Sequence, residues 1–433
     1  MKTFTKSIPI VIGIMAAFLL MGGNVARAQL YMKIQATFAS EVLGIEKHVN
    51  VYLPSDYYVY PNQDYATIYY LHGGGGNQNE GHTSANLYYA MHSQDTTIDS
   101  PPAIFVCPDA SCAPYLGSMY MNSELYGNYE DYIMQDVIGF VESNFRAKPD
   151  KNFRMISGIS MGGYGSASLS SKYPEKFRAC VPMSGGFSKD SMLYNFRTRC
   201  YQEQGTYNLN YTNGFYTSGF FTLCGGYSPN MDIEPYHIEI PFDTLGNWQD
   251  TVLSKWSEHE VIRRVKDLPD ENELAWFLIC GKQDELAFFP SHREFTDSLD
   301  FYGIGYDTSY FEGGHVFNTV SWMTAIHWMD SIINHSYLTL GIADYRQASA
   351  KINVYPNPVR NRTVVSLDLR ANNPVEICIY NIAGACLKKW QYQNQQPGLK
   401  EYLLDLKDLM QGIYTCRVQI GNEMITRKII KIE

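Results

Sequence analysis

The chain has 433 residues, 45% of them hydrophobic and 18% charged, so it can bury a large core and exceeds one typical domain in length. This composition excludes disordered and collagen-like proteins, and a net charge of −10 argues against a nucleic-acid-binding protein, because phosphate recognition needs a basic surface. Aromatic residues make up 14% of the chain, including 34 tyrosines. That content suits contact with sugars or aryl groups, or internal packing.

Residues 1–28 have the three parts of a secretory signal peptide. Lys2 and Lys6 form a basic start, an apolar run covers 8–21, and Ala26–Arg27–Ala28 supplies a cleavage site. The run is shorter than the ~20 apolar residues that a membrane span needs, and no later segment is long enough. We therefore expect a secreted chain that begins near Gln29 and has no membrane span.

From 29 to 336, short β-branched or aromatic runs alternate with helical stretches, which is typical of a mostly parallel sheet covered by helices. The expected strands are 48–53, 67–71, 103–107, 153–157, 180–183, 276–280 and 308–311. A helix is expected over 132–145. The segment at about 187–269 is long, rich in Tyr and Phe, and interrupted by Gly and Pro, so we expect an insertion over the top edge of the sheet. It would act as a lid or substrate platform.

Nine cysteines are present, without a C-x-x-C pair or a dense framework. Because the number is odd, at least one thiol stays free in a monomer. Cys200 and Cys224 could join parts of the insertion as a disulfide; buried unpaired cysteines are the alternative for most of the nine.

The C-terminal region has a different pattern. After a linker at 337–350, alternating strands are expected at 351–354, 364–369, 375–380, 402–406, 413–418 and 424–432. Pro and Gly mark the turns between them, which favours a small all-β sandwich over 351–433.

This tail resembles the C-terminal sorting domain of proteins exported by the type IX secretion system. The resemblance covers about the last 80 residues and rests on four segments: 354–359 (VYPNPV), 379–384 (IYNIAG), 409–414 (LMQGIY) and 428–431 (KIIK). It implies export through the outer membrane by the type IX machinery, with cleavage of the tail and attachment to the surface or release. An ordinary β-sandwich binding module is the alternative.

The strongest catalytic signal is Gly158-Ile159-Ser160-Met161-Gly162, a G-x-S-x-G sequence directly after an expected strand. Glycines flank the serine because a sharp strand-to-helix turn leaves no room for side chains and exposes the hydroxyl above the sheet. The motif alone is weak. The strand before it, the small residues after it and the partners downstream strengthen the assignment of Ser160 as a nucleophile.

Serine needs an imidazole to take its proton and a carboxylate to orient that imidazole. His315 follows the expected strand at 308–311, and Asp284 follows the one at 276–280, so both stand at carboxyl ends of strands, where sites gather in open α/β folds. Glu285 is the nearest rival to Asp284. Three further histidines, at 292, 327 and 335, fall within or at the end of helical patterns.

An ester hydrolase also needs donors for its oxyanion. The run Gly73–Gly76 follows the strand at 67–71, where bare backbone can direct N–H groups, and the N–H of Met161 would be the second donor. No Gly-Lys-Ser or Gly-Lys-Thr follows, which excludes a phosphate cradle. His259-Glu260 is followed by Arg263 where a zinc protease has a second histidine, so neither a metal nor a cofactor is expected.

The residues from about 41 to 330 resemble the esterase D and feruloyl esterase group, carbohydrate esterase family 1. The resemblance rests on five segments: 71–77, 128–132, 158–165, 173–177 and 313–315. It implies an α/β-hydrolase fold with Ser160, Asp284 and His315 as the triad, and with the N–H groups of Gly74 and Met161 as oxyanion donors. The chain departs from many relatives in having Phe317 where they have Trp, and in its longer insertion.

We therefore expect a secreted serine esterase that acts through an acyl-enzyme, with feruloyl or acetyl groups on xylan as the natural targets. Further substrate contacts are expected from His72, Phe317, Trp248 and Trp256. A larger set of aromatic residues in the insertion could form a platform that stacks on an aryl group or a sugar. Packing within the insertion's own core is an equally good explanation for any one of them: Tyr211, Phe215, Tyr216, Phe220, Phe221, Trp248 and Trp256. The alternatives are a general short-chain carboxylesterase, an acyltransferase, a siderophore esterase, a peptidase of the same fold, and a non-catalytic surface binding protein.

Overall fold

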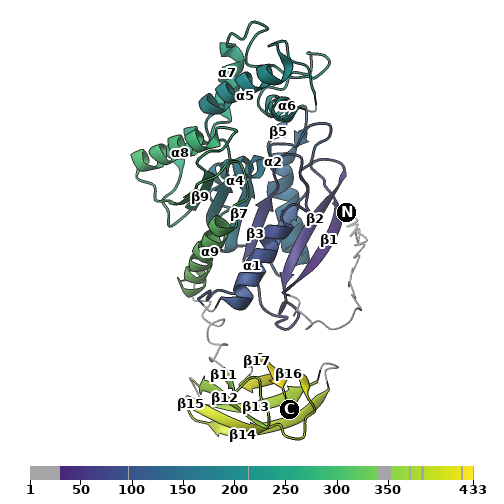
Figure 1. Ribbon diagram of the computed structural model, residues 1–433, viewed down its shortest axis with the longest axis vertical. Helices are drawn as coiled ribbons and strands as arrows, with labels where there is room; N and C mark the ends of the chain where they lie inside the picture. Colours follow the sequence, from purple (N-terminus) through teal and green to yellow (C-terminus); the bar gives the residue numbers. More distant parts are fainter. Residues whose placement is uncertain are drawn as a thin grey trace, which may run out of the picture. The chain divides into compact units, whose positions relative to one another are not determined.

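The computed structural model describes residues 30–95, 97–212, 214–339, 353–369, 372–381, 385–420 and 423–432. The expected signal peptide and most of the expected linker lie outside these residues. The chain divides into two compact units, with the boundary between Ser336 and Tyr337 (Figure 1). The last helix of the first unit, α9 (Thr319–Thr339), extends three residues into the segment expected to be linker.

The first unit is built on an eight-stranded sheet in the order β1-β2-β4-β3-β7-β8-β9-β10. Its strands are β1 (Tyr31–Ala39), β2 (Glu46–Pro54), β3 (Thr67–Leu71), β4 (Ile104–Pro108), β7 (Arg154–Ile159), β8 (Ala179–Met183), β9 (Ala275–Gly281) and β10 (Asp307–Phe311). The six strands from β4 to β10 in this order are parallel, whereas β1 and β2 pair antiparallel at one edge. The expected mostly parallel sheet is confirmed, and β1 is an additional strand.

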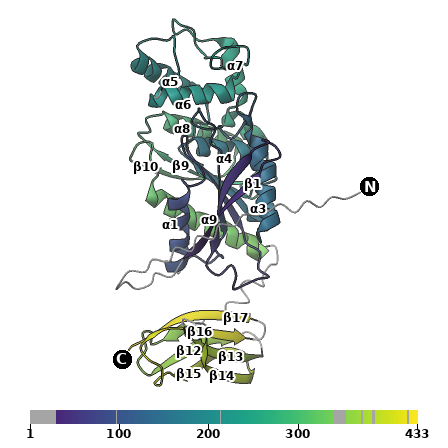
Figure 2. The ribbon, with the colours of Figure 1, turned by 90° about the vertical axis from the view of Figure 1, so that its right-hand side faces the viewer.

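Helices cover both faces of this sheet, and Figure 2 has α1 (His82–Gln94) and α3 (Ile138–Asn144) on opposite sides. On the α1 side, α9 lies beside α1, and the indole of Trp322 in α9 donates a hydrogen bond to the Ser84 carbonyl of α1 at 3.1 Å. On the other side, α4 (Met161–Lys172) packs against β7 and β8. The helix expected over 132–145 is interrupted: it begins with α2 (Tyr129–Asp131) and a π-helical segment, η1 (Tyr132–Val137).

The insertion lies between β8 and β9, over the carboxyl ends of the strands (Figure 1). It contains α5 (Lys189–Gln204), α6 (Phe215–Tyr227), α7 (Asp250–Glu258) and the 3₁₀ segment η3 (Val261–Asp267), and α8 (Phe288–Tyr302) follows β9. Cys200 and Cys224 are buried free thiols, so the insertion is not closed by a disulfide between them.

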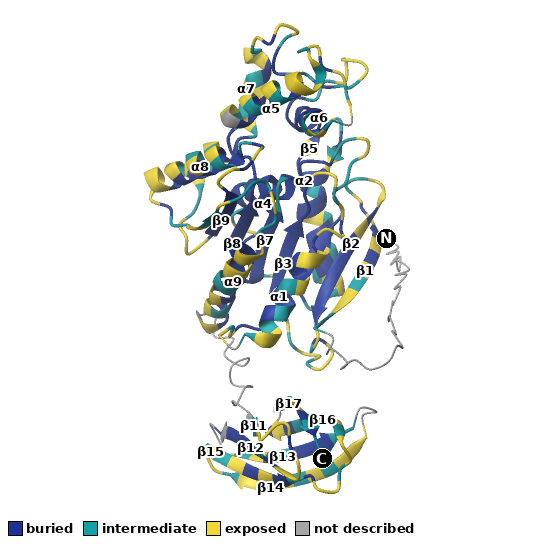
Figure 3. Ribbon diagram, viewed as in Figure 1, coloured by how far each residue is buried: buried dark blue, intermediate teal, exposed yellow. Residues whose placement is uncertain are grey.

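The aromatic residues of the insertion mostly form its own core. Phe220, Phe221 and Trp256 have no exposed surface, and the Trp256 indole donates to the Ser228 hydroxyl at 2.9 Å. The expectation that these three rings form a substrate platform is therefore wrong, since no ligand can reach them. The central strands of the sheet beneath are almost wholly buried (Figure 3), whereas the edge strands β1 and β10 are partly exposed. Fully buried tyrosines in the sheet and in the segments packed around it include Tyr52, Tyr65, Tyr69, Tyr70, Tyr88, Tyr89, Tyr120 and Tyr132.

Three histidines with largely or wholly buried rings predict a loss of stability in mild acid. Burial lowers the pKa of His72 and His259 to about 4 and that of His292 to about 3. Below the ordinary histidine pKa of about 6.5 the unfolded chain binds more protons than the folded chain, so stability falls as the pH drops through that value. For His292 we expect a loss of up to about 1.4 kcal/mol per pH unit, ending near its folded pKa. Melting curves at pH 7, 6 and 5 check this, and a melting temperature that rises toward pH 5 contradicts it.

The second unit consists of two antiparallel sheets. The first contains β11 (Asn353–Tyr355), β12 (Arg362–Leu369) and β15 (Gly398–Asp405); the second contains β14 (Cys386–Gln395), β13 (Asn373–Tyr380), β16 (Gly412–Ile420) and β17 (Glu423–Lys431). Their inward residues, among them Leu367, Ile377, Leu404 and Val418, form one buried cluster. The expected all-β fold of the tail is confirmed, with β14 as an additional strand. No helix in the described ranges of the chain is long and apolar enough to cross a bilayer.

Candidate active site

Ser160 occupies a sharp turn between β7 and α4. Its backbone has φ 58° and ψ −116°, a conformation that non-glycine residues rarely adopt. The turn is possible because the chain comes very close to β3: a Cβ on Gly162 would lie 2.0 Å from the Leu71 carbonyl oxygen, and one on Gly158 would lie 2.6 Å from it. The flanking glycines of the G-x-S-x-G motif are thus required by close backbone approach, and Ser160 is raised at the strand end.

The glycine run beside this turn leaves one N–H group free. The N–H of Gly73 donates to Glu80 Oε2 at 2.8 Å, that of Gly75 to the Leu116 carbonyl at 2.6 Å, and that of Gly76 to the Gly73 carbonyl at 3.1 Å. For the N–H groups of Gly74 and Met161, the described parts of the chain provide no acceptor. Gly74 and Met161 both line the cavity that contains Ser160. Two unoccupied donors beside a hydroxyl are what an oxyanion requires.

Glu80 holds the glycine run in place, a role that the sequence analysis missed. Its carboxylate bonds the N–H of Gly73, and burial raises the pKa of the group while that hydrogen bond opposes the rise. The sequence offered no clear signal, because a glutamate seven residues after the first glycine has no pattern of its own. The geometry makes Glu80 a positioning residue of the loop.

His72 supports the same loop, and the expectation that it contacts substrate is wrong. The side chain is buried, with Nδ1 2.8 Å from the Gly73 carbonyl and Nε2 accepting the Ala110 N–H at 2.9 Å. Since burial lowers its pKa to about 4, the ring is neutral at pH 7, and Nδ1 carries the proton that it donates to Gly73. Both ring nitrogens are therefore occupied within the protein.

Asp284 and His315 form a close pair at the carboxyl ends of β9 and β10. Asp284 Oδ2 lies 2.8 Å from His315 Nδ1, while Asp284 Oδ1 accepts the Leu286 N–H at 2.9 Å. The Asp284 side chain has no exposed surface, and that of His315 is 17% exposed. A buried carboxylate on Nδ1 leaves Nε2 as the nitrogen available to a reacting group.

Glu285, the rival acid, bonds the main chain of His315 instead of its ring. Its Oε2 accepts the His315 N–H at 2.7 Å, and this hydrogen bond is the largest cause of a lowered Glu285 pKa. Next to it, Gln283 Oε1 accepts the Gly313 N–H at 2.6 Å. The two loops that carry Asp284 and His315 are thus tied together at several points.

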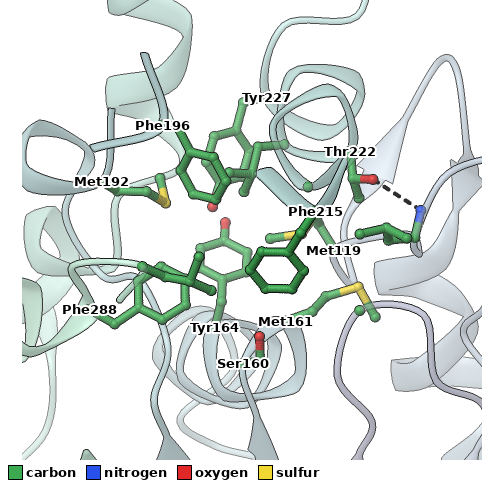
Figure 4. Close-up of a pocket in the computed structure, with 16 residues that line it drawn as sticks. Met119, Ser160, Met161, Tyr164, Met192, Phe196, Phe215, Thr222, Tyr227 and Phe288 are labelled. Carbon is green, nitrogen blue, oxygen red and sulfur yellow. Dashed lines mark hydrogen bonds between the residues drawn. The ribbon is translucent and has the colours of Figure 1, made fainter. Parts of the chain in front are cut away.

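Ser160 opens into a cavity of about 100 Å³ whose wall is mostly apolar (Figure 4). Its lining is Gly74, Leu116, Met119, Ser160, Met161, Tyr164, Gly186, Met192, Phe196, Phe215, Gly219, Thr222, Leu223, Tyr227, Leu286 and Phe288. In the close-up the hydroxyls of Tyr164 and Tyr227 point toward each other. Seven of the sixteen lining residues come from the insertion, and of the expected platform only Phe215 contributes.

His315 adjoins this cavity through Phe288. The two rings meet edge to face with centroids 5.4 Å apart, and Phe288 lines the cavity together with Ser160. Within the described structure the Ser160 hydroxyl makes no hydrogen bond, to His315 or to any other group. Catalytic hydrogen bonds are often long before substrate binds and shorten in the complex.

Trp248 and Phe317 lie outside the lining of this cavity, and their expected substrate contacts stay predictions. Trp248 is half-buried in the insertion, with the Arg197 guanidinium 4.5 Å from its ring centroid. Phe317 is half-buried against Trp322 of α9, at 6.3 Å between centroids. Both rings are engaged within the protein.

A serine on a strained strand-to-helix turn, two free N–H groups and a carboxylate–imidazole pair can support acyl transfer to the serine hydroxyl. No cluster of three or more metal-ligating side chains occurs among the residues whose positions are described. The fold and these groups define an α/β-hydrolase of the serine type. Residues 40–330 match the Esterase family, so the chain belongs to that family, and residues 353–433 match the Secretion system C-terminal sorting domain.

The chain is similar to several known proteins. It is 24% identical over 282 residues to Esterase Rv1288 of Mycobacterium tuberculosis, a match covering 65% of this chain and 55% of the relative. It therefore spans about half the length of that relative. It is 29% identical over 156 residues to an endo-1,4-beta-xylanase/feruloyl esterase of Xylanibacter ruminicola, covering 35% of this chain and 21% of the relative.

Two solved structures have related folds. A ferulic acid esterase has a TM-score of 0.49 and 18% identity, with 71% of this chain and 98% of the other covered. S-formylglutathione hydrolase (FrmB) of Staphylococcus aureus has a TM-score of 0.46 and 18% identity, with coverages of 70% and 99%.

Proposed function

We propose that this protein is a secreted serine esterase that removes feruloyl or acetyl groups from plant cell-wall polysaccharide such as xylan. One observation carries the proposal: Ser160, on its strained turn, opens into a cavity beside two free N–H groups, and His315 of the Asp284–His315 pair contacts Phe288 of the same cavity lining. Each of these groups has a defined task in ester cleavage.

In the proposed reaction the Ser160 oxygen bonds to the ester carbonyl carbon while its proton moves to His315 Nε2. The N–H groups of Gly74 and Met161 stabilise the negative oxygen of the tetrahedral intermediate. His315 then gives the proton to the leaving alcohol oxygen as the carbon–oxygen bond breaks, which leaves an acyl group on Ser160. Water attacks that acyl group with the same imidazole as base, and the carboxylic acid is released.

The cavity favours an aryl acyl group over a bare acetyl group. Phe196, Phe215 and Phe288 provide aromatic surface for an apolar, planar group, since aromatic rings gain from offset or edge contacts. The facing hydroxyls of Tyr164 and Tyr227 give the cavity a polar point. The Tyr164 hydroxyl donates to the His259 carbonyl at 3.1 Å, so its oxygen would serve a phenolic hydroxyl as an acceptor. The similarity to the Xylanibacter ruminicola xylanase/feruloyl esterase supports the same choice of substrate.

The C-terminal unit supports export. Residues 353–433 match a secretion sorting domain, and the expected signal peptide at 1–28 would deliver the chain across the inner membrane first. Type IX machinery is the proposed partner, and an extracellular polysaccharide is then within reach of the site.

The proposed function is tested with a panel of esters. Purified protein is assayed on methyl ferulate, acetylated xylan and p-nitrophenyl acetate, with Ser160→Ala as the blank. Release of ferulate well above acetate is expected. Uniform slow cleavage of all three would indicate a general carboxylesterase, and turnover equal to the blank would contradict an esterase.

Phe215→Ala is expected to raise the KM for methyl ferulate roughly three- to tenfold while changing the KM for p-nitrophenyl acetate less than twofold. The reason is that Phe215 is 61% exposed in the empty cavity and becomes covered only when a ring lies against it. Phe301→Ala is the matched control, because Phe301 is an 81% exposed phenylalanine on α8 outside the cavity lining. Equal changes for both esters would contradict an aryl contact at Phe215.

A further inference from the structure

A second hollow, of about 570 Å³, lies on another side of α5 from the cavity of Ser160. Met192 and Phe196 of α5 line the Ser160 cavity, whereas the second hollow is lined by Tyr194, Asn195, Thr198, Arg199, Gln202 and Ala287. We name this second hollow the α5 groove. The two hollows share no residue, and their linings differ in residue type: aromatic and aliphatic side chains prevail in the first, whereas two amides, a hydroxyl and a guanidinium are among the six lining residues of the second.

The lining of the α5 groove is suited to a carbohydrate. The Arg197 guanidinium lies 5.5 Å from the Tyr194 ring centroid, but Tyr194 is 64% exposed, so aromatic surface is left on which a pyranose ring can lie. Around it stand side-chain amides and a hydroxyl, which can donate and accept hydrogen bonds as sugar hydroxyls do. Arg199 forms no ion pair with a carboxylate in the described chain; its guanidinium lies 5.3 Å from the Tyr216 ring centroid and donates to Gln202 Oε1 at 3.4 Å.

The α5 groove is connected directly to the loop of the Asp284–His315 pair. Asn195 Nδ2 donates to the Glu285 carbonyl at 3.0 Å, and Glu285 Oε2 in turn accepts the His315 N–H. The next residues alternate between the two hollows: Leu286 and Phe288 line the Ser160 cavity, and Ala287 lines the α5 groove. Ala287 has φ 61°, so the chain turns sharply at this ridge.

The chemistry of ester cleavage indicates which part of the substrate lies near each of the two hollows. In ester cleavage the acyl part stays on the serine, and the leaving alcohol must lie next to the imidazole that protonates it. The apolar cavity next to Ser160 is suited to the acyl part. The alcohol part therefore departs on the side of His315, where the loop 284–288 borders the α5 groove.

We propose that the α5 groove binds the carbohydrate that carries the ester, with Tyr194 stacking on a sugar ring and with Asn195 and Gln202 bonding its hydroxyls. The inference rests on the proposed function. It adds a second binding site, which selects the alcohol part of the substrate independently of the acyl part.

The first test compares two substrates that share an acyl group: methyl ferulate and a feruloylated xylo-oligosaccharide. In wild-type protein the oligosaccharide ester should have the lower KM. Tyr194→Ala is expected to raise the ratio of the two KM values (oligosaccharide ester to methyl ester) roughly three- to tenfold, with kcat for the oligosaccharide ester unchanged, because only uniform binding is lost. An unchanged ratio would overturn the proposal.

Tyr201→Ala is the matched control. Tyr201 is also an exposed tyrosine on α5, but its ring packs against Tyr207, at 4.6 Å between centroids, and does not line the α5 groove. The ratio should stay at the wild-type value in this variant. The same rise in both variants would show a general effect on α5 and would overturn the assignment to Tyr194.

A second measurement separates failure of this inference from failure of the esterase function. Unesterified xylohexaose is titrated into the full chain by calorimetry, which needs no catalysis. Binding to wild-type protein and to Tyr201→Ala, with at least a threefold weaker Kd in Tyr194→Ala, supports the groove. Absent binding, or equal binding to all three proteins, overturns it, whatever the ester panel gives.

Discussion

Ser160→Ala is expected to lower kcat for methyl ferulate by at least about 10⁴-fold. The alanine cannot form the acyl-enzyme, and removal of a catalytic serine from a serine protease costs about 10⁶ in kcat. Binding should persist, because the cavity wall and the free N–H groups of Gly74 and Met161 are untouched. Steady-state kinetics give the rate, and equilibrium binding of ferulate to the variant gives the affinity.

Ser93→Ala is the matched control for this change. Ser93 is an exposed serine on α1 whose hydroxyl bonds the Ala90 carbonyl at 2.9 Å, so its loss should leave kcat within twofold of wild type. A Ser160→Ala protein that is folded, as judged by its melting temperature, and retains more than a tenth of the wild-type rate would contradict the role of Ser160.

Asp284→Asn is expected to lower kcat by about 10³- to 10⁴-fold, the second-largest effect. An amide in place of the buried carboxylate can bond His315 Nδ1 only in the wrong tautomer and cannot stabilise the imidazolium that forms; the corresponding change in a serine protease costs about 10⁴. The comparison is made on one ester at one pH, with enzyme concentrations set by absorbance.

Comparison of Glu285→Gln with Asp284→Asn tests which of the two adjacent carboxylates is the acid of the triad. Glu285 bonds the main-chain N–H of His315, and a glutamine oxygen can accept the same hydrogen bond, so we expect a loss of tenfold or less. If the glutamine variant lost more activity than Asp284→Asn, the acid of the triad would be Glu285. The sequence left this choice open to both residues, and the hydrogen-bond pattern separates their tasks.

The parts of the fold that could be predicted are those with a strong local pattern. The parallel strands, except the edge strand β10, are buried on both faces, so they appear in the sequence as short apolar runs. Each expected strand of the sheet has a counterpart within a few residues. Two of the strands that the sequence did not indicate are less apolar. β1 is an edge strand with several exposed residues, and β14 alternates lysine and glutamine with Trp390 and Tyr392.

The catalytic residues could be predicted because the order of the motifs along the chain and the ends of the strands indicate their positions. The G-x-S-x-G turn places Ser160 at the end of β7, and loops after β9 and β10 bring Asp284 and His315 within 2.8 Å. The cavity wall was not predictable, because it is assembled from separate segments of the insertion, of α4 and of the surrounding loops, without a periodic pattern. Residue type alone also gave wrong predictions. Trp256 and His72 were expected to contact substrate, yet both side chains are buried and form hydrogen bonds within the protein.

The most direct test of the proposed mechanism is to identify the nucleophile by covalent labelling. The full chain is treated with an aryl fluorophosphonate, which traps an activated serine, and the labelled peptides are identified by mass spectrometry. We expect one label per chain, on Ser160, with activity on methyl ferulate lost in proportion to labelling and no label in Ser160→Ala. Complete inactivation with Ser160 unmodified, or full activity with Ser160 labelled, would contradict it.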